Sequence, residues 1–206
     1  MKKCYIVGAG ELHGSFVPEM GDLVIAADGG YDRLISLGIA PSLVVGDLDS
    51  VKDTPEGVEI IRHKVEKDET DMHLAYLEGA SRGYEEFEIY GGTGGREDHT
   101  FANYCLLYYI RQHGGRAKLI GKNTVSTVII NEEIELFGTE GATFSVFAFG
   151  KDAKDVSVLG AKYEARGADL SMSFPLGVSN SHLSGKARVS VGDGALLIIS
   201  EIQQST

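Results

Sequence analysis

Short apolar runs alternate with segments of helical spacing over the first 120 residues. The runs are three to five residues long and end at Gly or at a polar turn, which is typical of buried strands. This pattern predicts strands at residues 4–8, 23–27, 43–45, 58–62, 87–90 and 117–120, and helices at 31–37, 71–82 and 98–112. Strands that alternate with helices form βαβ units, so we expect a mostly parallel, Rossmann-like sheet in a three-layer α/β domain.

The pattern changes near Lys122, after which no segment has convincing helical spacing. Short β-rich runs recur instead, at residues 125–130, 134–137, 143–149, 156–159, 187–191 and 195–200. Turn residues separate them, for example Gly160 and Gly192-Asp193-Gly194. We therefore predict two domains: an α/β domain at residues 1–121 and an antiparallel β-sandwich domain at residues 122–206.

The composition and net charge of the chain argue against some classes of binding partner. The chain has 206 residues, 43% of them hydrophobic, and a net charge of −11. That charge argues against a nucleic-acid partner, which would require a basic face. No apolar run is long enough to span a bilayer, and the run before Gly8 is too short for a signal peptide. Cys4 and Cys105 lie in apolar runs and are predicted to be buried free thiols. We expect a cytoplasmic protein with no membrane partner.

Carboxylates follow two of the predicted strands. Asp28-Gly29-Gly30 ends one apolar run, and Gly46-Asp47-Leu48-Asp49-Ser50 follows the next. Because the carboxyl ends of parallel strands meet at one edge of a sheet, these acids should converge where ligands bind. Clustered carboxylates repel unless a cation lies among them, and hard oxygen ligands suit Mg²⁺. The alternative for Asp47 and Asp49 is a polar turn in which Ser50 caps a helix.

More acids open the second predicted helix. Thr70 is a good N-cap residue, and Asp71 in the first turn complements the helix dipole. Asp68 and Asp71 would both lie near the helix N-terminus, on the ligand side of the sheet. Lys67 adds a cation that could reach a phosphate. The alternative is a solvated run of charges with only a structural role.

A glycine-rich loop precedes the third predicted helix. Gly91-Gly92-Thr93-Gly94-Gly95 has four glycines in five residues, which costs conformational entropy and therefore needs a reason. Backbone N–H groups at the start of a helix form an anion site, and Arg96 can grip a phosphate with two hydrogen bonds. Asp98 could cap the helix, hold Arg96 or take a metal, and His99 could touch a ligand. The loop is not a Walker motif, and a flexible surface loop is the alternative.

Two other classes of function remain open at this point. Gly8-Ala9-Gly10 with Asp28 imitates a dinucleotide-binding fingerprint, but Gly14 follows Gly10 by four residues where three are needed. A dinucleotide-dependent oxidoreductase is therefore one alternative, and a turn with some capacity for phosphate is the simpler interpretation. The second alternative is a catalytically silent binding module.

Taken together, five segments in order resemble the thiamine pyrophosphokinase family. They are ADGGYDRL at 27–34, GIAPSLVVGDLDS at 38–50, EKDETDMHLA at 66–75, GGTGGREDHTFANYCLL at 91–107 and FPLGVSN at 174–180. The resemblance covers nearly the whole chain. It implies that residues 1–121 form the catalytic domain, which binds ATP and Mg²⁺, and that the β-sandwich at residues 122–206 binds thiamine. It also implies a homodimer with active sites between subunits, which transfers pyrophosphate from ATP to the hydroxyl of thiamine and releases AMP.

The resemblance also implies roles for individual residues. Mg²⁺ would be held by Asp47, Asp49 and Asp71. ATP would be bound by Lys67, Asp68, Thr70, Gly94, Gly95, Arg96 and His99, and thiamine by Ser179, Asn180 and Asp98. The catalytic residues would be Asp71, Arg96 and Asp98, with Asp71 or Asp98 accepting the hydroxyl proton. Since the chain has no Trp, any aromatic stacking on thiamine must use Tyr or Phe.

Overall fold

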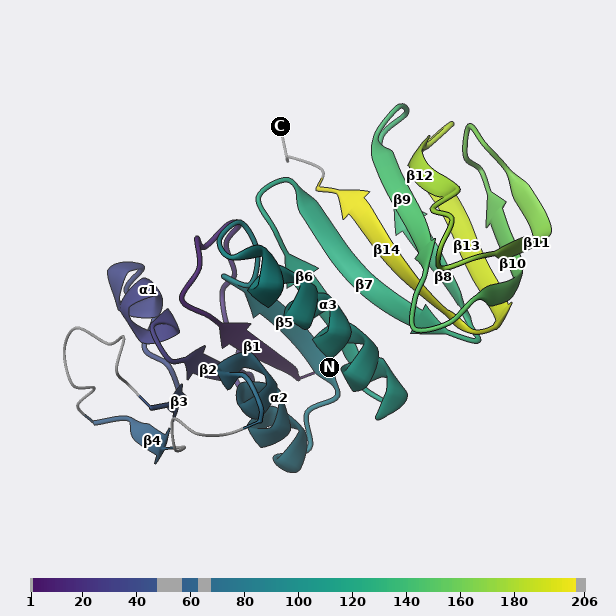
Figure 1. Cartoon of the computed structure of the whole chain (residues 1–206). Coiled ribbons are helices and arrows are strands. Elements are labelled where there is room, and N and C mark those ends of the chain that lie inside the picture. Colours follow the sequence, from purple (N-terminus) through teal and green to yellow (C-terminus); the bar gives the residue numbers. More distant parts are fainter. Residues whose placement is uncertain (1, 48–56, 63–67, 203–206) are drawn as a thin grey trace. The chain divides into compact units, whose positions relative to one another are not determined.

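The computed structural model describes residues 2–47, 57–62 and 68–202 of the chain (Figure 1). The chain divides into two compact units, Met1–Leu106 with His113–Lys122 and Leu107–Gln112 with Asn123–Thr206. The predicted boundary after residue 121 lies one residue before the break at Lys122. Residues 107–112, which we placed in the first domain, group with the second unit.

The first unit is built on a parallel sheet with the strand order β6-β5-β1-β2-β3-β4. Its strands are β1 (Lys3–Val7), β2 (Leu23–Ala27), β3 (Leu43–Gly46), β4 (Glu59–Arg62), β5 (Glu86–Tyr90) and β6 (Arg116–Ile120). Every pairing between these neighbours is parallel. The predicted parallel sheet is therefore confirmed, with strand ends within about two residues of the expected positions.

Helices cover both faces of this sheet. α1 (Gly30–Ser36) contributes Leu34 to a cluster on the face that carries Tyr5 and Val7. α2 (Asp71–Ser81) lies on the opposite face, where a Cβ atom at Gly79 would be only 2.9 Å from the Cys4 sulfur. α3 (Glu97–Gln112) lies on the same face as α2 (Figure 1). These are the three layers that the alternation of strands and helices predicted.

The two cysteines differ in environment. Cys4 is fully buried in β1, and burial raises the pKa of its thiol to about 12. Cys105 is exposed, so the prediction of two buried thiols is wrong for this residue. The apolar run around Cys105 is part of a helix, and a helix turns some of its positions outward even within such a run.

The order of the strands predicts which edge of the sheet binds ligands. The chain proceeds from β1 through β2 and β3 to β4, and then returns to place β5 on the other side of β1. The loops that follow β1 and β5 therefore leave the sheet in different directions. In open α/β sheets, ligands bind in the crevice at such a switch point, outside the carboxyl ends of the strands.

The second unit is an antiparallel β-sandwich, as predicted. One sheet has the order β12-β9-β14-β7 and the other β11-β10-β13-β8. The strands are β7 (Thr124–Ile130), β8 (Glu133–Phe137), β9 (Thr143–Ala148), β10 (Ala153–Leu159), β11 (Ala165–Leu170), β12 (Gly177–Ser181), β13 (Lys186–Asp193) and β14 (Ala195–Glu201). Residues of both sheets, such as Phe144 and Val189, share one buried core. β11 and β12 were not predicted from the sequence.

In the described part of the chain, no helix has both the length and the apolar character required to cross a membrane.

Candidate active site

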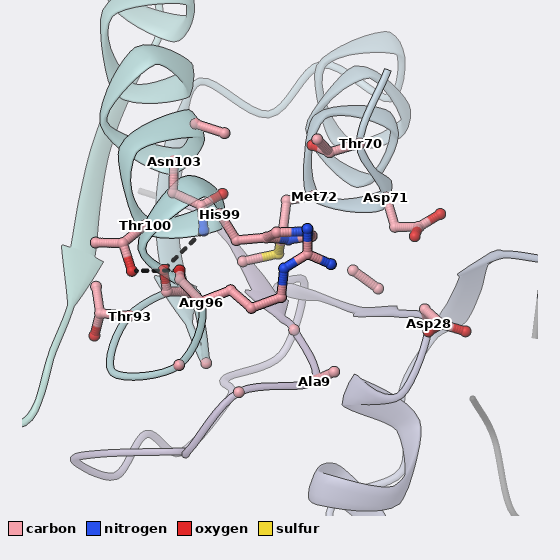
Figure 2. A pocket seen from close by; sticks show the side chains of 17 residues that line it. Ala9, Asp28, Thr70, Asp71, Met72, Thr93, Arg96, His99, Thr100 and Asn103 are labelled. Carbon is pink, nitrogen blue, oxygen red and sulfur yellow. Dashed lines mark hydrogen bonds between the residues drawn. The ribbon is translucent and has the colours of Figure 1, made fainter. Parts of the chain in front are cut away.

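A cavity of about 510 Å³ lies at the switch point of the parallel sheet (Figure 2). Four segments of the first unit form it: the loop after β1, the end of β2, the first turn of α2, and the glycine loop that leads from β5 into α3. The lining residues are Gly8, Ala9, Gly10, Ala27, Asp28, Thr70, Asp71, Met72, Gly91, Gly92, Thr93, Gly95, Arg96, His99, Thr100, Ala102 and Asn103. The crevice expected from the strand order is therefore present.

The glycine loop has a packed half and an open half. Gly91 and Gly92 are buried, and a Cβ atom at Gly92 would lie within 3.2 Å of Leu119, Asn103 and Met72. Asn103, only 5% exposed, donates a hydrogen bond from Nδ2 to the Gly92 carbonyl at 2.8 Å. In contrast, Gly95 is exposed, and a Cβ atom at this position would have no neighbouring atom within 4 Å. The first half thus anchors the loop, while the second half leaves backbone accessible to a ligand.

The turn after β1 is joined to the glycine loop. Gly8 N–H donates to the Tyr90 carbonyl at 2.9 Å, and Gly10 N–H donates to the Gly91 carbonyl at 3.1 Å. A Cβ atom at Gly10 would lie 2.5 Å from the Gly91 oxygen. These glycines therefore permit two backbones to approach closely, and their amides are already engaged. This close packing of two backbones explains why the sequence resembles a dinucleotide-binding fingerprint.

Arg96 and Asp98 form an ion pair at the start of α3. Arg96 donates to the two Asp98 carboxylate oxygens at 3.2 Å and 2.6 Å, and Asp98 also accepts the His99 N–H at 2.9 Å. The hydrogen bond from Arg96 lowers the pKa of the Asp98 carboxyl and raises that of the guanidinium. Figure 2 shows Arg96 extending into the cavity. The pair presents a cation to the cavity and holds Asp98 in its anionic form.

The first turn of α2 forms the opposite side of the cavity. Thr70 is the N-cap residue, and its Oγ1 accepts the His73 N–H at 3.2 Å. Asp71 is the first residue of the helix and is half-buried. The predicted cap is confirmed, and it places the Asp71 carboxylate beside the helix N-terminus, where negative charge is favoured.

The structure brings together only part of the predicted site. Of the expected ATP, metal and catalytic residues, Thr70, Asp71, Gly95, Arg96 and His99 line the cavity. Asp47, Asp68, Gly94 and Asp98 are described but are not among the lining residues, and Lys67 and Asp49 lie outside the described residues. Within the described ranges, no three His, Cys, Asp or Glu side chains lie close enough to hold a metal ion.

Several lining residues were not assigned a role from the sequence. Asn103 could have been noticed as a polar residue within an apolar helical run. Thr93 and Thr100 carried no distinguishing signal. Asp28 was expected among the acids that converge at the ligand-binding edge but received no specific role, and it lines the same cavity as Asp71.

Ser179 and Asn180, the expected thiamine ligands, lie in β12 of the second unit. Ser179 is exposed and has a positive φ of 58°, within a register shift between Gly177 and Asn180. Asn180 is only 7% exposed. Its Oδ1 accepts the backbone N–H groups of Tyr163 at 3.0 Å and Ser181 at 2.9 Å, and its Nδ2 donates to the Tyr163 carbonyl at 2.7 Å. The Asn180 side chain thus fixes the Tyr163 backbone.

Comparison with known proteins gives two family matches, one in each part of the chain. The family model of the thiamin pyrophosphokinase catalytic domain matches residues 18–119, and that of the thiamin pyrophosphokinase vitamin B1 binding domain matches residues 126–196. The chain belongs to the thiamin pyrophosphokinase family. The catalytic-domain match contains most of the cavity lining, and the vitamin B1 binding match contains Ser179 and Asn180.

Individual proteins that are similar to this chain are thiamine pyrophosphokinases. The thiamine pyrophosphokinase of Bacillus subtilis is 27% identical over an alignment of 184 residues, and the match covers 86% of this chain and 86% of that protein. A crystal structure of the Bacillus subtilis enzyme has a TM-score of 0.90 at 24% identity, over 98% of this chain and 100% of that one. The thiamin pyrophosphokinase of Candida albicans has a TM-score of 0.76 at 16% identity, over 98% and 89% of the chains. At these identities the solved structures establish the shared fold.

A first prediction concerns Asn180 in the vitamin B1 binding domain. We expect Asn180→Ala to lower the free energy of unfolding by about 1–3 kcal/mol, because it leaves the N–H and C=O of Tyr163 without these partners. Thermal or urea unfolding measures the change. Asn123→Ala removes an exposed asparagine side chain of the same unit and should have little effect. If both variants unfold like the parent, Asn180 does not fix this backbone.

Proposed function

We propose that this protein transfers a pyrophosphoryl group from ATP to the hydroxyl of thiamine, giving thiamine diphosphate and AMP. The proposal rests on the cavity at the switch point of the parallel sheet. There a glycine loop, an arginine and the N-terminus of α2 converge within the region matched by the catalytic-domain model. This combination suits a triphosphate, and the neighbouring vitamin B1 binding match supports thiamine as the acceptor.

The triphosphate would bind along the open half of the glycine loop. Gly95 offers backbone without side-chain obstruction, and Arg96 offers a planar group that can bind two phosphate oxygens. Thr70, Lys67, Asp68, Gly94 and His99 complete the proposed ATP-binding set. Arg96 would stabilise the negative charge that develops on the transferred group, which is the main task of a protein in phosphoryl transfer.

Mg²⁺ is the proposed metal. It is commonly bound by one or two carboxylates together with substrate phosphates and several waters, so a preformed cage of three acids is not required. Asp47 directly follows β3, Asp71 lines the cavity, and Asp49 follows Asp47 in the sequence. These carboxylates would hold the ion. When bound, Mg²⁺ would neutralise charge on the triphosphate and help to orient it.

The two candidate proton acceptors differ in their surroundings. The pKa of the Asp98 carboxyl is lowered by the hydrogen bond from Arg96, which makes it a weaker base. We therefore assign Asp98 to orienting Arg96, close to the reacting groups and to thiamine. Asp71 is the remaining candidate to accept the proton of the thiamine hydroxyl.

Thiamine would be bound by Ser179 and Asn180, contributed by the other subunit of a homodimer in the cytoplasm. Ser179 supports this assignment through its backbone. A non-glycine residue with left-handed φ is strained, and such strain is commonly found at ligand sites. Asn180 would act in part by fixing the neighbouring backbone of Tyr163.

A second prediction follows for Ser179. Ser179→Gly removes the hydroxyl and relieves the left-handed conformation, so we expect equal or slightly higher stability. The KM for thiamine should rise about three- to tenfold, the effect of one hydrogen bond, while the KM for ATP stays constant. Asp155→Gly relieves a similar φ of 53° at another exposed residue and should change neither KM. An unchanged KM for thiamine in Ser179→Gly would contradict the assignment.

The test of the proposed function is AMP release from ATP and Mg²⁺, with and without thiamine. AMP that depends on thiamine, with an equal amount of thiamine diphosphate, would establish donor, acceptor and transferred group together. Release of ADP would instead mean transfer of a single phosphoryl group. No turnover by folded protein would favour a different acceptor or a silent binding module.

A further inference from the structure

Asp28 is held in an unusual conformation at the end of β2. Its φ of 48° is in the left-handed region, which disfavours residues with a Cβ atom. Its N–H donates to the Val45 carbonyl at 2.8 Å, and its carbonyl accepts the Tyr31 N–H at 3.1 Å. A Cβ atom at Gly46 would lie 3.2 Å from the Asp28 Cα. The neighbouring strand and α1 thus fix this backbone, although glycine would adopt the conformation with less strain.

The carboxylate of Asp28 is incompletely satisfied. Its Oδ1 is buried and has no hydrogen-bond partner in the described part of the chain. Burying an acceptor without a partner is unfavourable, and native proteins usually satisfy such groups with protein, water or a ligand. Asp28 lines the cavity, on the side of Asp71 (Figure 2). A bound ligand is therefore well placed to supply the missing donor.

The chemistry of the site restricts what that donor can be. A carboxylate repels phosphate oxygens directly, so the partner of Asp28 must be a donor group of the nucleotide or of its metal ion. A metal–nucleotide complex carries two kinds of O–H donor, the ribose hydroxyls and the waters bound to the metal. The end of β2, beside the turn after β1, is also where doubly wound folds place an acid that binds ribose.

We propose that Asp28 accepts a hydrogen bond from an O–H group of the bound metal–nucleotide complex. The donor is either a ribose hydroxyl or a metal-bound water. This inference rests on the proposed function, because it assumes that the cavity binds ATP. It explains why a strained position surrounded by Gly29, Gly30 and Gly46 carries an aspartate rather than another glycine.

The test is ATP affinity, measured by titration calorimetry without thiamine. Asp28→Gly removes the carboxylate and relieves the backbone, and we expect its Kd for Mg·ATP to rise about 10–100-fold, the range for hydrogen bonds to charged groups. Asp28→Asn keeps the size and tolerates left-handed φ, and it should show a smaller increase. Kd values within about twofold of the parent in both variants would overturn the proposal, since the expected loss for such a bond is larger.

Changing the ligand distinguishes the two donors. The Kd ratio between Asp28→Gly and the parent is compared for Mg·ATP, ATP with EDTA, and the 2′-deoxy and 3′-deoxy forms of Mg·ATP. A ratio that falls toward one only with EDTA assigns the loss to the metal ion and its bound water, and a ratio that falls only with a deoxy nucleotide identifies that ribose hydroxyl. An equal ratio for all four ligands would overturn the proposal, because the loss would then not depend on either donor.

Two controls separate this inference from other effects. Asp193→Asn removes the same charge in the second unit and should leave ATP affinity unchanged. Without ligand, Asp28→Gly should have an equal or higher Tm than the parent, and a lower Tm would indicate a structural role and overturn the proposal. If the parent does not bind Mg·ATP, the proposed function itself is wrong. If the parent binds Mg·ATP and the variants bind it equally well, only the inference about Asp28 is wrong.

Discussion

Replacing Asp71 with Asn is expected to reduce thiamine-dependent AMP release by about 10²–10³-fold with the fold intact. The range is that found for single electrostatic groups that act on the transition state. Asp71 is the first residue of α2 and lines the cavity, where we assign it to the metal and to the hydroxyl proton. Asparagine has the same shape but can neither accept that proton nor balance the charge of a metal ion.

The fold of Asp71→Asn should persist because Thr70 caps α2 through the His73 N–H. Loss of one negative charge near the helix N-terminus costs only about 0.3–1 kcal/mol. Glu78→Gln, in the same helix and outside the cavity lining, controls for the loss of a carboxylate from α2. Turnover of Asp71→Asn near that of the parent would remove Asp71 from the catalytic set.

The first unit was predictable because each of its elements carries a local signal. Parallel strands buried on both faces are short and continuously apolar, as in Leu23–Ala27, and the helices between them begin or end at recognisable caps. Thr70 before Asp71 is one such cap. The order of the elements then implied which strand ends would meet, and the cavity lies at that edge.

β11 and β12 could not be predicted by the same reasoning. Each is the outer strand of its sheet, so each pairs on one side only. β12 has the sequence GVSNS, in which only Asn180 is buried, and β11 has the sequence ARGADL, in which only Leu170 is buried. Edge strands with polar residues lack the alternation on which strand prediction depends.

Within the site, sequence identified types of residue but not their hydrogen-bond partners. Gly8 and Gly10 suggested a phosphate turn, yet their N–H groups bind the carbonyls of Tyr90 and Gly91. Asn180 was expected to contact thiamine, but nothing in the sequence indicated that its side chain binds the Tyr163 backbone. Asp28 was expected at the ligand-binding edge, but the sequence could not show that its Oδ1 is buried without a partner in the described chain. Such partners depend on contacts between segments that are distant in the sequence.

Arg96→Ala should also reduce turnover by about 10²–10³-fold, through loss of charge stabilisation on the transferred group. Arg96→Lys should recover only part of this loss, since an ammonium group cannot bind two phosphate oxygens in a planar fork. Because the Arg96 side chain is 72% exposed and its Asp98 partner 64% exposed, removing the ion pair should change Tm little. Rate measurements under saturating ATP and thiamine, with thermal unfolding of each variant, test these expectations.

The second unit contains an ion pair that resembles the pair of Arg96 and Asp98. Arg166 is also 72% exposed and binds Glu164, two positions away, at 3.2 Å. Arg166→Ala therefore removes an equally exposed arginine and its local ion pair, and it should leave turnover unchanged. A large loss in Arg96→Ala alone would locate the effect in the cavity rather than in the general loss of a surface cation. Similar turnover in the two variants would refute the role of Arg96 in stabilising the transferred group.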